Sequence, residues 1–324
     1  MVGTFLTGRY PEPNKKDVHN HFIEERLVNV HVGFVGLGEA GYNMAKGLAG
    51  EGLKDIKAFD VAVNLGGKYK ETVLERAKDA GVTLVDSIED IVAQCNVIFC
   101  AVQAQYSAEV AAKVLPAMRP DVFYIDVTTA TPKLKKSMAV EFADKGFFFV
   151  DGAMMGALPI DRHKVSMLCS GKGAEDVSKV MNGHGMKMEY AHGDAGMAST
   201  LKLARSSFTK GCEALAVEAM LFAHKLGVEK EVLKSLGASY GKTTFDETLV
   251  RYIRSDMIHA ERRSHEVEEC MNLMEEFGVT PIMAKAAYER MQRVAKLGLK
   301  EELGGKTPAT AEEVFALWDK KKFS

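Results

Sequence analysis

The sequence lacks any apolar run that approaches the roughly 20 residues needed to span a bilayer, and its N-terminus lacks the apolar core of a signal peptide. It also lacks a sustained basic stripe, and its net charge is only −2. Electrostatic attraction to nucleic acid or to an anionic membrane is therefore not expected. These absences predict a cytoplasmic protein whose partners include neither nucleic acid nor a membrane.

Cysteine is scarce, because the 324 residues contain only five cysteines and no C-x-x-C pair. Most of them lie in apolar surroundings, where a thiol serves as a small hydrophobic side chain. His19 and His21 resemble a metal-binding pair, but no Cys, His or carboxylate partner stands at ligand spacing. The sequence therefore indicates neither a disulfide framework nor a metal site.

Short β-rich runs alternate with helical runs from Val30 onward, which is typical of a parallel sheet covered by helices. The polar residues 1–28, with two prolines, are predicted to form an extension before the first strand. The expected strands are Val30–Val35, Ile56–Phe59, Thr83–Val85, Val97–Val102, Val122–Asp126, Phe147–Val150 and Val165–Cys169, with a further short run at Met186–Tyr190. The expected helices between them are Ala40–Ala49, Glu71–Ala80, Ile88–Gln94, Ala108–Met118 and Lys133–Lys145. Helix-capping patterns occur at Ser87, Thr131 and Thr310.

The pattern becomes helical after Ala195. The run from Met197 to Leu226 contains no proline, and Gly227 follows it at a position that favours a C-cap. Further helices are expected at Lys230–Leu236, Thr244–Phe277 and Pro281–Lys296, and after Thr310. The sequence thus predicts an α/β Rossmann-type domain with a mostly parallel sheet over residues 29–195 and an all-α domain over residues 196–324. Helices that stay apolar beyond one face need a partner surface, so we expect a homodimer through the helical domain.

A glycine-rich stretch stands between the first strand and the first helix. Gly36, Gly38 and Gly41 have the G-x-G-x-x-G spacing, and Asp60 follows at the end of the second strand, as a dinucleotide fingerprint requires. The residues expected to bind the cofactor are Gly36, Leu37, Gly38, Glu39, Ala40, Gly41, Asp60, Val102 and Gln103. Asp60 would accept hydrogen bonds from ribose hydroxyls and repel a 2′-phosphate, which favours NAD over NADP. Lys68 and Lys70 leave NADP open, since a loop could bring either lysine to a phosphate.

A second chemically loaded stretch begins the long helix. Lys202, Arg205 and Ser206 share one helix face by their i, i+3 and i+4 spacing. Lysine can act as an acid or base when burial or a neighbouring cation lowers its pKa, and Arg205 is predicted to be that cation. The alternative is a solvated cationic face.

The chain resembles the β-hydroxyacid dehydrogenase family, relatives of 6-phosphogluconate and 3-hydroxyisobutyrate dehydrogenases, over roughly Val30 to Lys320. The resemblance rests on the glycine turn, on Asp126 to Pro132 matching D-x-S-T-x-x-P, on Asp151 to Ala157 matching D-A-P-V-S-G-G, and on Gly196 to Lys202 matching G-x-G-x-x-x-K. It implies that Lys202 is the catalytic acid/base and that Thr129 contacts the cofactor.

Several positions depart from the family pattern. Met155 stands where the family has a substrate-binding serine, Ala157 and Ala198 replace glycines, and Arg205 stands where the family has a substrate-binding asparagine. The stretch Leu201 to Gly211 resembles a branch of 6-phosphogluconate dehydrogenase-like proteins with its own C-terminal helical domain. The substrate-binding residues expected from the motifs and this branch are Thr128, Met155, Gly156, Arg205, Ser206, Lys210, Arg263 and His265.

These observations predict an NAD(P)-dependent oxidoreductase that transfers a hydride between nicotinamide and a small hydroxy or oxo acid. Lys202 would exchange the hydroxyl proton, and the guanidinium of Arg205 would bind the substrate carboxylate. Two alternatives stay open. One is imine or opine reduction with the same cofactor, and the other is a dinucleotide-binding module without catalysis.

Overall fold

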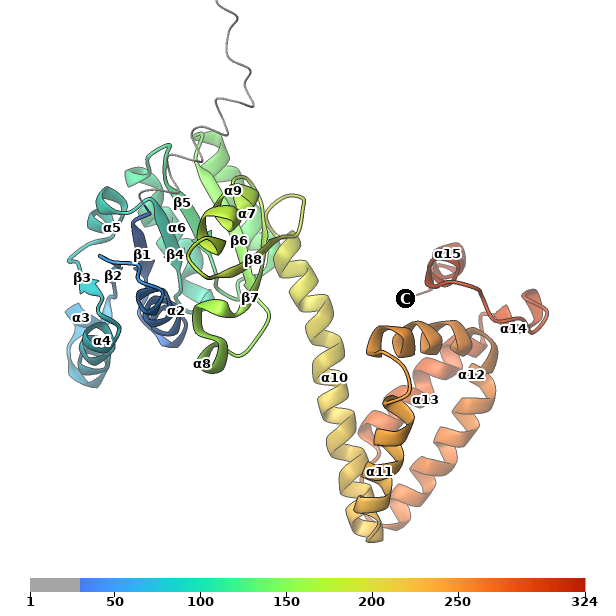
Figure 1. The fold of residues 1–324 in the computed structure, drawn as a ribbon. Coiled ribbons are helices and arrows are strands. Elements are labelled where there is room, and N and C mark those ends of the chain that lie inside the picture. The colour runs from blue at the N-terminus through green and yellow to red at the C-terminus, as the bar shows by residue number, and fades with distance from the viewer. Residues whose placement is uncertain (1–29, 324) are drawn as a thin grey trace, which may run out of the picture. The chain divides into compact units, whose positions relative to one another are not determined.

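The computed structural model describes residues 30–323 and contains two compact units, which divide at Arg205 (Figure 1). The predicted extension, residues 1–28, lies outside the described residues. We expected the boundary near Ala195. The contacts instead group the first turns of the long helix with the sheet, because Ser199 of that helix bonds directly to Asp151.

The first unit is built on one eight-stranded sheet with the order β3-β2-β1-β4-β5-β6-β7-β8. Every neighbouring pair is parallel except β6 and β7, which confirms the predicted mostly parallel Rossmann-type sheet. The strands are β1 (Val32–Val35), β2 (Lys57–Phe59), β3 (Thr83–Leu84), β4 (Val97–Cys100), β5 (Phe123–Asp126), β6 (Phe148–Met154), β7 (Ser166–Ser170) and β8 (Lys187–Tyr190).

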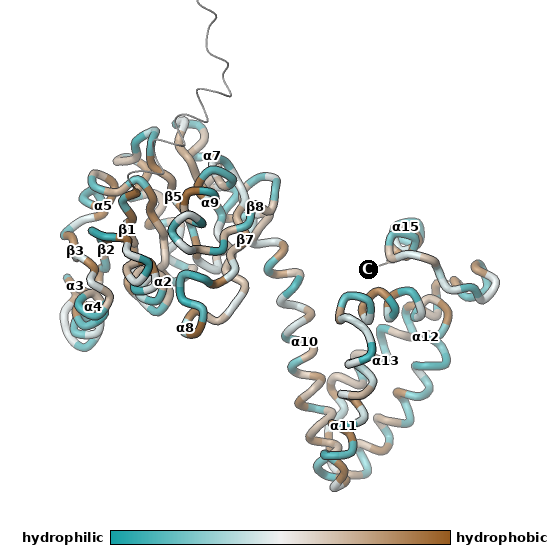
Figure 2. Tube along the Cα trace, viewed as in Figure 1, coloured by the Kyte–Doolittle hydropathy of each residue, from teal (hydrophilic) through white to brown (hydrophobic). Residues whose placement is uncertain are grey.

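Helices cover both faces of this sheet, as the alternating pattern requires. They are α2 (Glu39–Gly50), α3 (Ala62–Leu65), α4 (Gly67–Ala80), α5 (Ile88–Gln94), α6 (Ser107–Val114), α7 (Pro132–Asp144), α8 (Leu158–Asp161) and α9 (Ala174–Asn182), with short 3-10 turns at Ala104–Tyr106, Leu115–Ala117 and Arg162–Lys164. One buried apolar cluster joins the sheet to α2, α4 and α9, and the other joins it to α5, α6 and α7. Hydrophobic segments, drawn in brown, occur along central strands such as β1 and β5 (Figure 2).

Several elements differ from the sequence expectation, and the structure gives the physical reason for two of them. Strand β6 continues to Met154, because it pairs with β7 as far as Met154 opposite Met167, so Asp151 lies inside the strand rather than after it. Helix α6 ends before Pro116, whose ring disrupts helical hydrogen bonding, and a 3-10 turn follows. Helices α3, α8, α9 and α14 were not predicted.

The second unit continues α10 (Met197–Leu226), which matches the predicted run, and its described residues form helices joined by turns and loops, without strands. Its other helices are α11 (Glu229–Tyr240), α12 (Phe245–Glu276), α13 (Ile282–Ala295), α14 (Leu299–Glu302) and α15 (Ala311–Lys321). The backbone at Gly227 is left-handed, as predicted for a C-cap. The carboxylate of Glu218 on α10 accepts the N–H groups of Met283 and Ala284, both at 2.8 Å, and so holds the start of α13.

The predicted capping side chains are in place. Ser87 Oγ accepts the N–H of Asp90 at 3.0 Å, and the hydroxyls of Thr131 and Thr310 cap α7 and α15 in the same way. Within residues 30–323, no helix combines the length and the apolar character that a membrane crossing requires.

Candidate active site

The glycine turn after β1 has one position that is open and two that are filled by backbone. Gly36 has φ +96°, and a Cβ there would lie 2.8 Å from the carbonyl oxygen of Ala101. A Cβ at Gly41 would lie 2.1 Å from Gly36 O, so only glycine fits. A Cβ at Gly38 would meet no atom within 4 Å, and Gly38 is the N-cap of α2 without a capping side chain. The turn therefore leaves an open helix N-terminus.

This geometry fits a dinucleotide, because a helix N-terminus offers free N–H groups to a pyrophosphate and Gly38 allows its close approach. Asp60 follows β2 beside the turn. Its Oδ2 accepts the N–H of Leu37 at 2.8 Å and its Oδ1 accepts the N–H of Ala62 at 2.9 Å. Each carboxylate oxygen keeps a second lone pair, so Asp60 can also accept ribose hydroxyls.

Arg76 on α4 is a cation at this turn that sequence reasoning missed. Its Nη1 donates to Leu37 O at 3.2 Å, and its guanidinium lies over the ring of Tyr42. Lys68 is exposed and Lys70 is half-buried on the same helix. Arg76 belongs to no sequence motif, so the sequence contained no signal for its contact with Leu37.

The ends of β4 and β5 bring two further predicted stretches to the same edge of the sheet. Val102 lies beside the glycine turn, because its Cγ1 would be 3.0 Å from a Cβ at Gly36, and Gln103 is exposed. After β5, Thr128 is buried and its hydroxyl accepts the N–H of Ala130 at 3.1 Å. Thr129 is exposed. Thr129 therefore offers the free hydroxyl of this pair.

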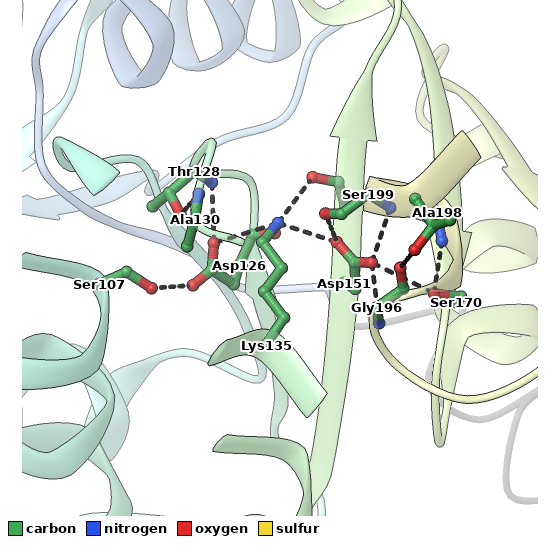
Figure 3. A network of polar contacts seen from close by, with 12 residues as sticks. Ser107, Asp126, Thr128, Ala130, Lys135, Asp151, Ser170, Gly196, Ala198 and Ser199 are labelled. Carbon is green, nitrogen blue, oxygen red and sulfur yellow. Dashed lines mark hydrogen bonds and ion pairs between the residues drawn. The ribbon is translucent and has the colours of Figure 1, made fainter. Parts of the chain in front are cut away.

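A buried polar network lies next to these strand ends (Figure 3). Lys135 of α7 lies between two aspartates. Asp126 is the last residue of β5, and Asp151 lies within β6. Its Nζ is 2.8 Å from Asp151 Oδ1 and 3.4 Å from Asp126 Oδ1, and all three side chains have no exposed surface. Ser107 donates to the other oxygen of Asp126.

The same network holds the start of α10. Asp151 Oδ2 accepts the N–H groups of Gly196 at 3.0 Å and Ser199 at 2.9 Å, and Asp151 Oδ1 accepts the hydroxyl of Ser199 at 2.7 Å. A carboxylate in this position also matches the positive end of the helix dipole. Gly196 has φ +99°, and a Cβ there would lie 2.8 Å from Pro132 O. Residue 196 must therefore be glycine, because the backbone of Pro132 lies too close for a side chain.

Lys202 follows one turn after this anchored start and is half-buried. Burial lowers the pKa of its ammonium, and the nearby cation Lys135 lowers this pKa further, whereas Asp151 raises it. The expected lowering of the pKa is therefore present. The expected cation is wrong, because the repulsion comes from Lys135, and Arg205 instead donates its Nη1 to Met155 O at 3.1 Å.

The predicted substrate residues fall into two groups. The first group is Arg205, Met155 and Gly156 in the first unit. Arg205 is exposed and contacts Met155, and Gly156, the residue after Met155, is also exposed. Thr128 also lies in the first unit, buried after β5. The remaining four belong to the second unit: Ser206 and Lys210 lie further along α10, where Lys210 pairs with Glu213 at 3.0 Å, and Arg263 and His265 lie on α12, where they contact Ser255 and Glu268. Their roles in substrate binding stay predictions.

Comparisons with known proteins bear on both units. The NAD binding domain of 6-phosphogluconate dehydrogenase matches residues 31–193, and a domain of unknown function (DUF1932) matches residues 223–294. The mitochondrial 3-hydroxyisobutyrate dehydrogenase of Drosophila melanogaster is 26% identical over 64% of this chain and 62% of its own length. This chain belongs to the β-hydroxyacid dehydrogenase family.

Several solved structures resemble most of the chain. A conserved protein reported as similar to 3-hydroxyacid dehydrogenases is 28% identical, with TM-score 0.56 over 84% of this chain and 99% of that one. A conserved protein of Sinorhizobium meliloti 1021 is 30% identical, with TM-score 0.57 over 82% and 88%. An imine reductase variant from Myxococcus stipitatus, solved with NAD+, has TM-score 0.70 over 84% and 96% at 18% identity, which supports the fold alone.

Proposed function

We propose that this family member is an NAD(P)-dependent oxidoreductase that interconverts a small hydroxy acid and its oxo acid, with Lys202 as general acid/base. The observation that carries the proposal is the half-buried Lys202 with a lowered pKa, one turn after a helix start that buried Asp151 fixes. The nicotinamide, when bound, supplies the two-electron redox chemistry. In oxidation, neutral Lys202 Nζ accepts the proton of the substrate hydroxyl, and in reduction its ammonium returns it.

Arg205 is proposed to bind the substrate carboxylate. One guanidinium nitrogen is engaged by Met155 O, but a guanidinium has five N–H donors, so a two-point contact to a carboxylate is still available. The backbone carbonyl of Met155 orients this cation, and the Met155 side chain supplies no hydroxyl for the substrate. The proposed substrate is therefore a carboxylic acid whose carboxylate binds the guanidinium of Arg205.

The proposal is tested by turnover with a panel of small oxo acids plus NADH or NADPH, followed by loss of reduced-cofactor absorbance. A parallel panel pairs the same carbonyl compounds with amines. Saturable turnover of oxo acids alone supports the proposal. Turnover only when an amine is present identifies imine reduction instead, and tight cofactor binding without turnover in either panel identifies a binding module.

Asp60 is expected to make NAD(H) the preferred cofactor, because its carboxylate accepts ribose hydroxyls and repels a 2′-phosphate. Asp60→Ala should narrow the difference between the dissociation constants for NADH and NADPH, measured by cofactor fluorescence. The loss of the Leu37 contact weakens both cofactors alike, so the ratio is the informative quantity. Native protein that binds NADPH as tightly as NADH would contradict the assignment.

We also propose self-association through the helical domain. Large apolar side chains on α10 and α11 are exposed, among them Val217 at 67% and Leu233 at 57%. Isolated exposed apolar residues are ordinary, but rows of them along neighbouring turns favour a protein partner. A cytoplasmic location stays a prediction from the sequence.

A further inference from the structure

Lys135 is a lysine without exposed surface, which is costly unless its charge is fully paired. Four oxygens surround its Nζ: Asp151 Oδ1 at 2.8 Å, Asp126 O at 2.9 Å, Asp126 Oδ1 at 3.4 Å and Gly152 O at 3.5 Å. The carboxylates come from neighbouring strands and the lysine comes from the helix between them. Such a buried ion triad is weak evidence for stability alone, which raises the question of what else it does.

On one side, the triad controls the start of α10. Asp151 accepts three hydrogen bonds from Gly196 and Ser199 while its Oδ1 also holds Lys135. Ser170 adds a parallel link, because its Oγ accepts the N–H of Ala198 at 3.0 Å. The position of Asp151 therefore decides where the first turn of α10 lies and, one turn later, where Lys202 lies.

On the other side, the triad controls the turn after β5. Asp126 Oδ1 accepts the N–H of Thr128 at 2.8 Å, and Ser107 of α6 donates to Asp126 Oδ2. This turn presents the exposed hydroxyl of Thr129. Lys135 thus joins the strand end proposed to contact the cofactor to the helix that carries the proposed acid/base (Figure 3).

We infer that Lys135 is a positioning residue that fixes Lys202 relative to the turn after β5 and sets the charge around it. The inference rests on the proposed function only for its effect on turnover. It places Lys135 among the residues that the reaction needs, although the side chain is buried and touches neither substrate nor cofactor.

The charges around Lys202 give this role a directional test. Lys135 lowers the pKa of Lys202 and Asp151 raises it, and the remaining charged group of the triad is Asp126, which is paired with Lys135. Removing the positive charge of Lys135 should therefore raise the pKa of Lys202. Removing the negative charge of Asp151 should lower it. A general loss of packing would move Lys202 toward ordinary lysine behaviour in both variants.

The experiment measures how fast an amine-reactive acetylating reagent modifies Lys202 as a function of pH, and mass spectrometry of the Lys202 peptide gives the extent of modification. The experiment needs no turnover, so it is independent of the reaction. The midpoint is the pH at which this rate is half of its maximum. The midpoint for Lys202 should rise by about 0.5 or more in Lys135→Met and fall by a similar amount in Asp151→Asn. Lys135→Arg, which keeps the charge, should restore the wild-type midpoint, while its different shape lowers kcat with little change in cofactor affinity.

Lys136→Met is the matched control, because Lys136 is the next residue of α7 and is exposed. Its midpoint should match wild type. If Lys135→Met does not fold because two carboxylates lose their cation, Asp151→Asn and Lys135→Arg still carry the test. Midpoints that move in the same direction in every variant, or that stay within about 0.2 of wild type, overturn the inference. Opposite shifts together with full turnover in Lys202→Ala would support the positioning role and refute the catalytic assignment.

Discussion

The two units of this protein bury their apolar residues to very different extents. In the first unit, two large clusters pack on either face of the sheet, and even charged residues such as Lys135 are fully covered. In the second unit, the buried cluster of the described residues has six members, all from α12 to α15. The first unit therefore holds its charged side chains within a large core. The second unit has a small core, and the exposed apolar residues along α10 and α11 favour a partner.

The largest expected effect separates a core side chain of the first unit from an exposed side chain of the second. Phe99 in β4 has no exposed surface and stacks on Phe34 with ring centroids 5.3 Å apart. Phe99→Ala should lower the free energy of unfolding by about 3–5 kcal/mol. Phe315→Ala, at a side chain that is 46% exposed in α15, should cost about 1 kcal/mol or less. Urea unfolding of each variant measures the difference, and equal costs would contradict the comparison.

The next effect concerns self-association. Val217→Glu places a charge on the exposed apolar face of α10 and should weaken the proposed dimer at least about tenfold, because burying an unpaired charge is costly. Val140→Glu, at a valine that is 53% exposed on α7, is the matched control and should leave the dimer intact. Sedimentation equilibrium distinguishes them. Wild-type protein that stays monomeric at micromolar concentration would refute the proposal.

The smallest effect is a difference in the rate at which buried and exposed cysteine thiols are alkylated in the folded protein. Burial raises the pKa of the Cys95 thiol to about 11 and those of Cys100 and Cys169 to about 12, whereas Cys212 and Cys270 in the second unit are exposed. At pH 8 the three buried thiols stay protonated and shielded, so they should not react with an alkylating reagent. Mass mapping should find Cys212 and Cys270 modified before the three buried thiols. Reaction of any buried thiol at the rate of Cys270 would show that the first unit opens readily.

Sequence patterns predicted the elements whose signal is local. The spacing of Gly36, Gly38 and Gly41 fixed the turn, and the absence of proline from Met197 to Leu226 predicted α10 with its observed ends. The sheet order and the antiparallel β7 depend on pairing between distant segments. For that reason the end of β6 was placed too early, and Asp151 was taken for a loop residue rather than a buried anchor.

The buried triad was missed because a lysine in a helical run is usually solvated. A signal existed, since Lys135 precedes Met138 and Phe142 by three and seven residues and so shares their buried face of α7. Arg205 shows the reverse error. Its i+3 spacing from Lys202 suggested electrostatic coupling, but the side chain turns to Met155 O, and spacing alone does not give side-chain direction.

The central claim is that Lys202 moves the proton in the reaction, and Lys202→Ala tests it most directly. The measurement compares the dissociation constant for NADH with kcat on the best substrate of the panel, with Lys225→Ala, an exposed lysine in the last turn of the same helix, as control. The account predicts cofactor affinity within about threefold of wild type and a kcat lower by about 10² or more, with the control unchanged. Near-native kcat in Lys202→Ala would contradict it.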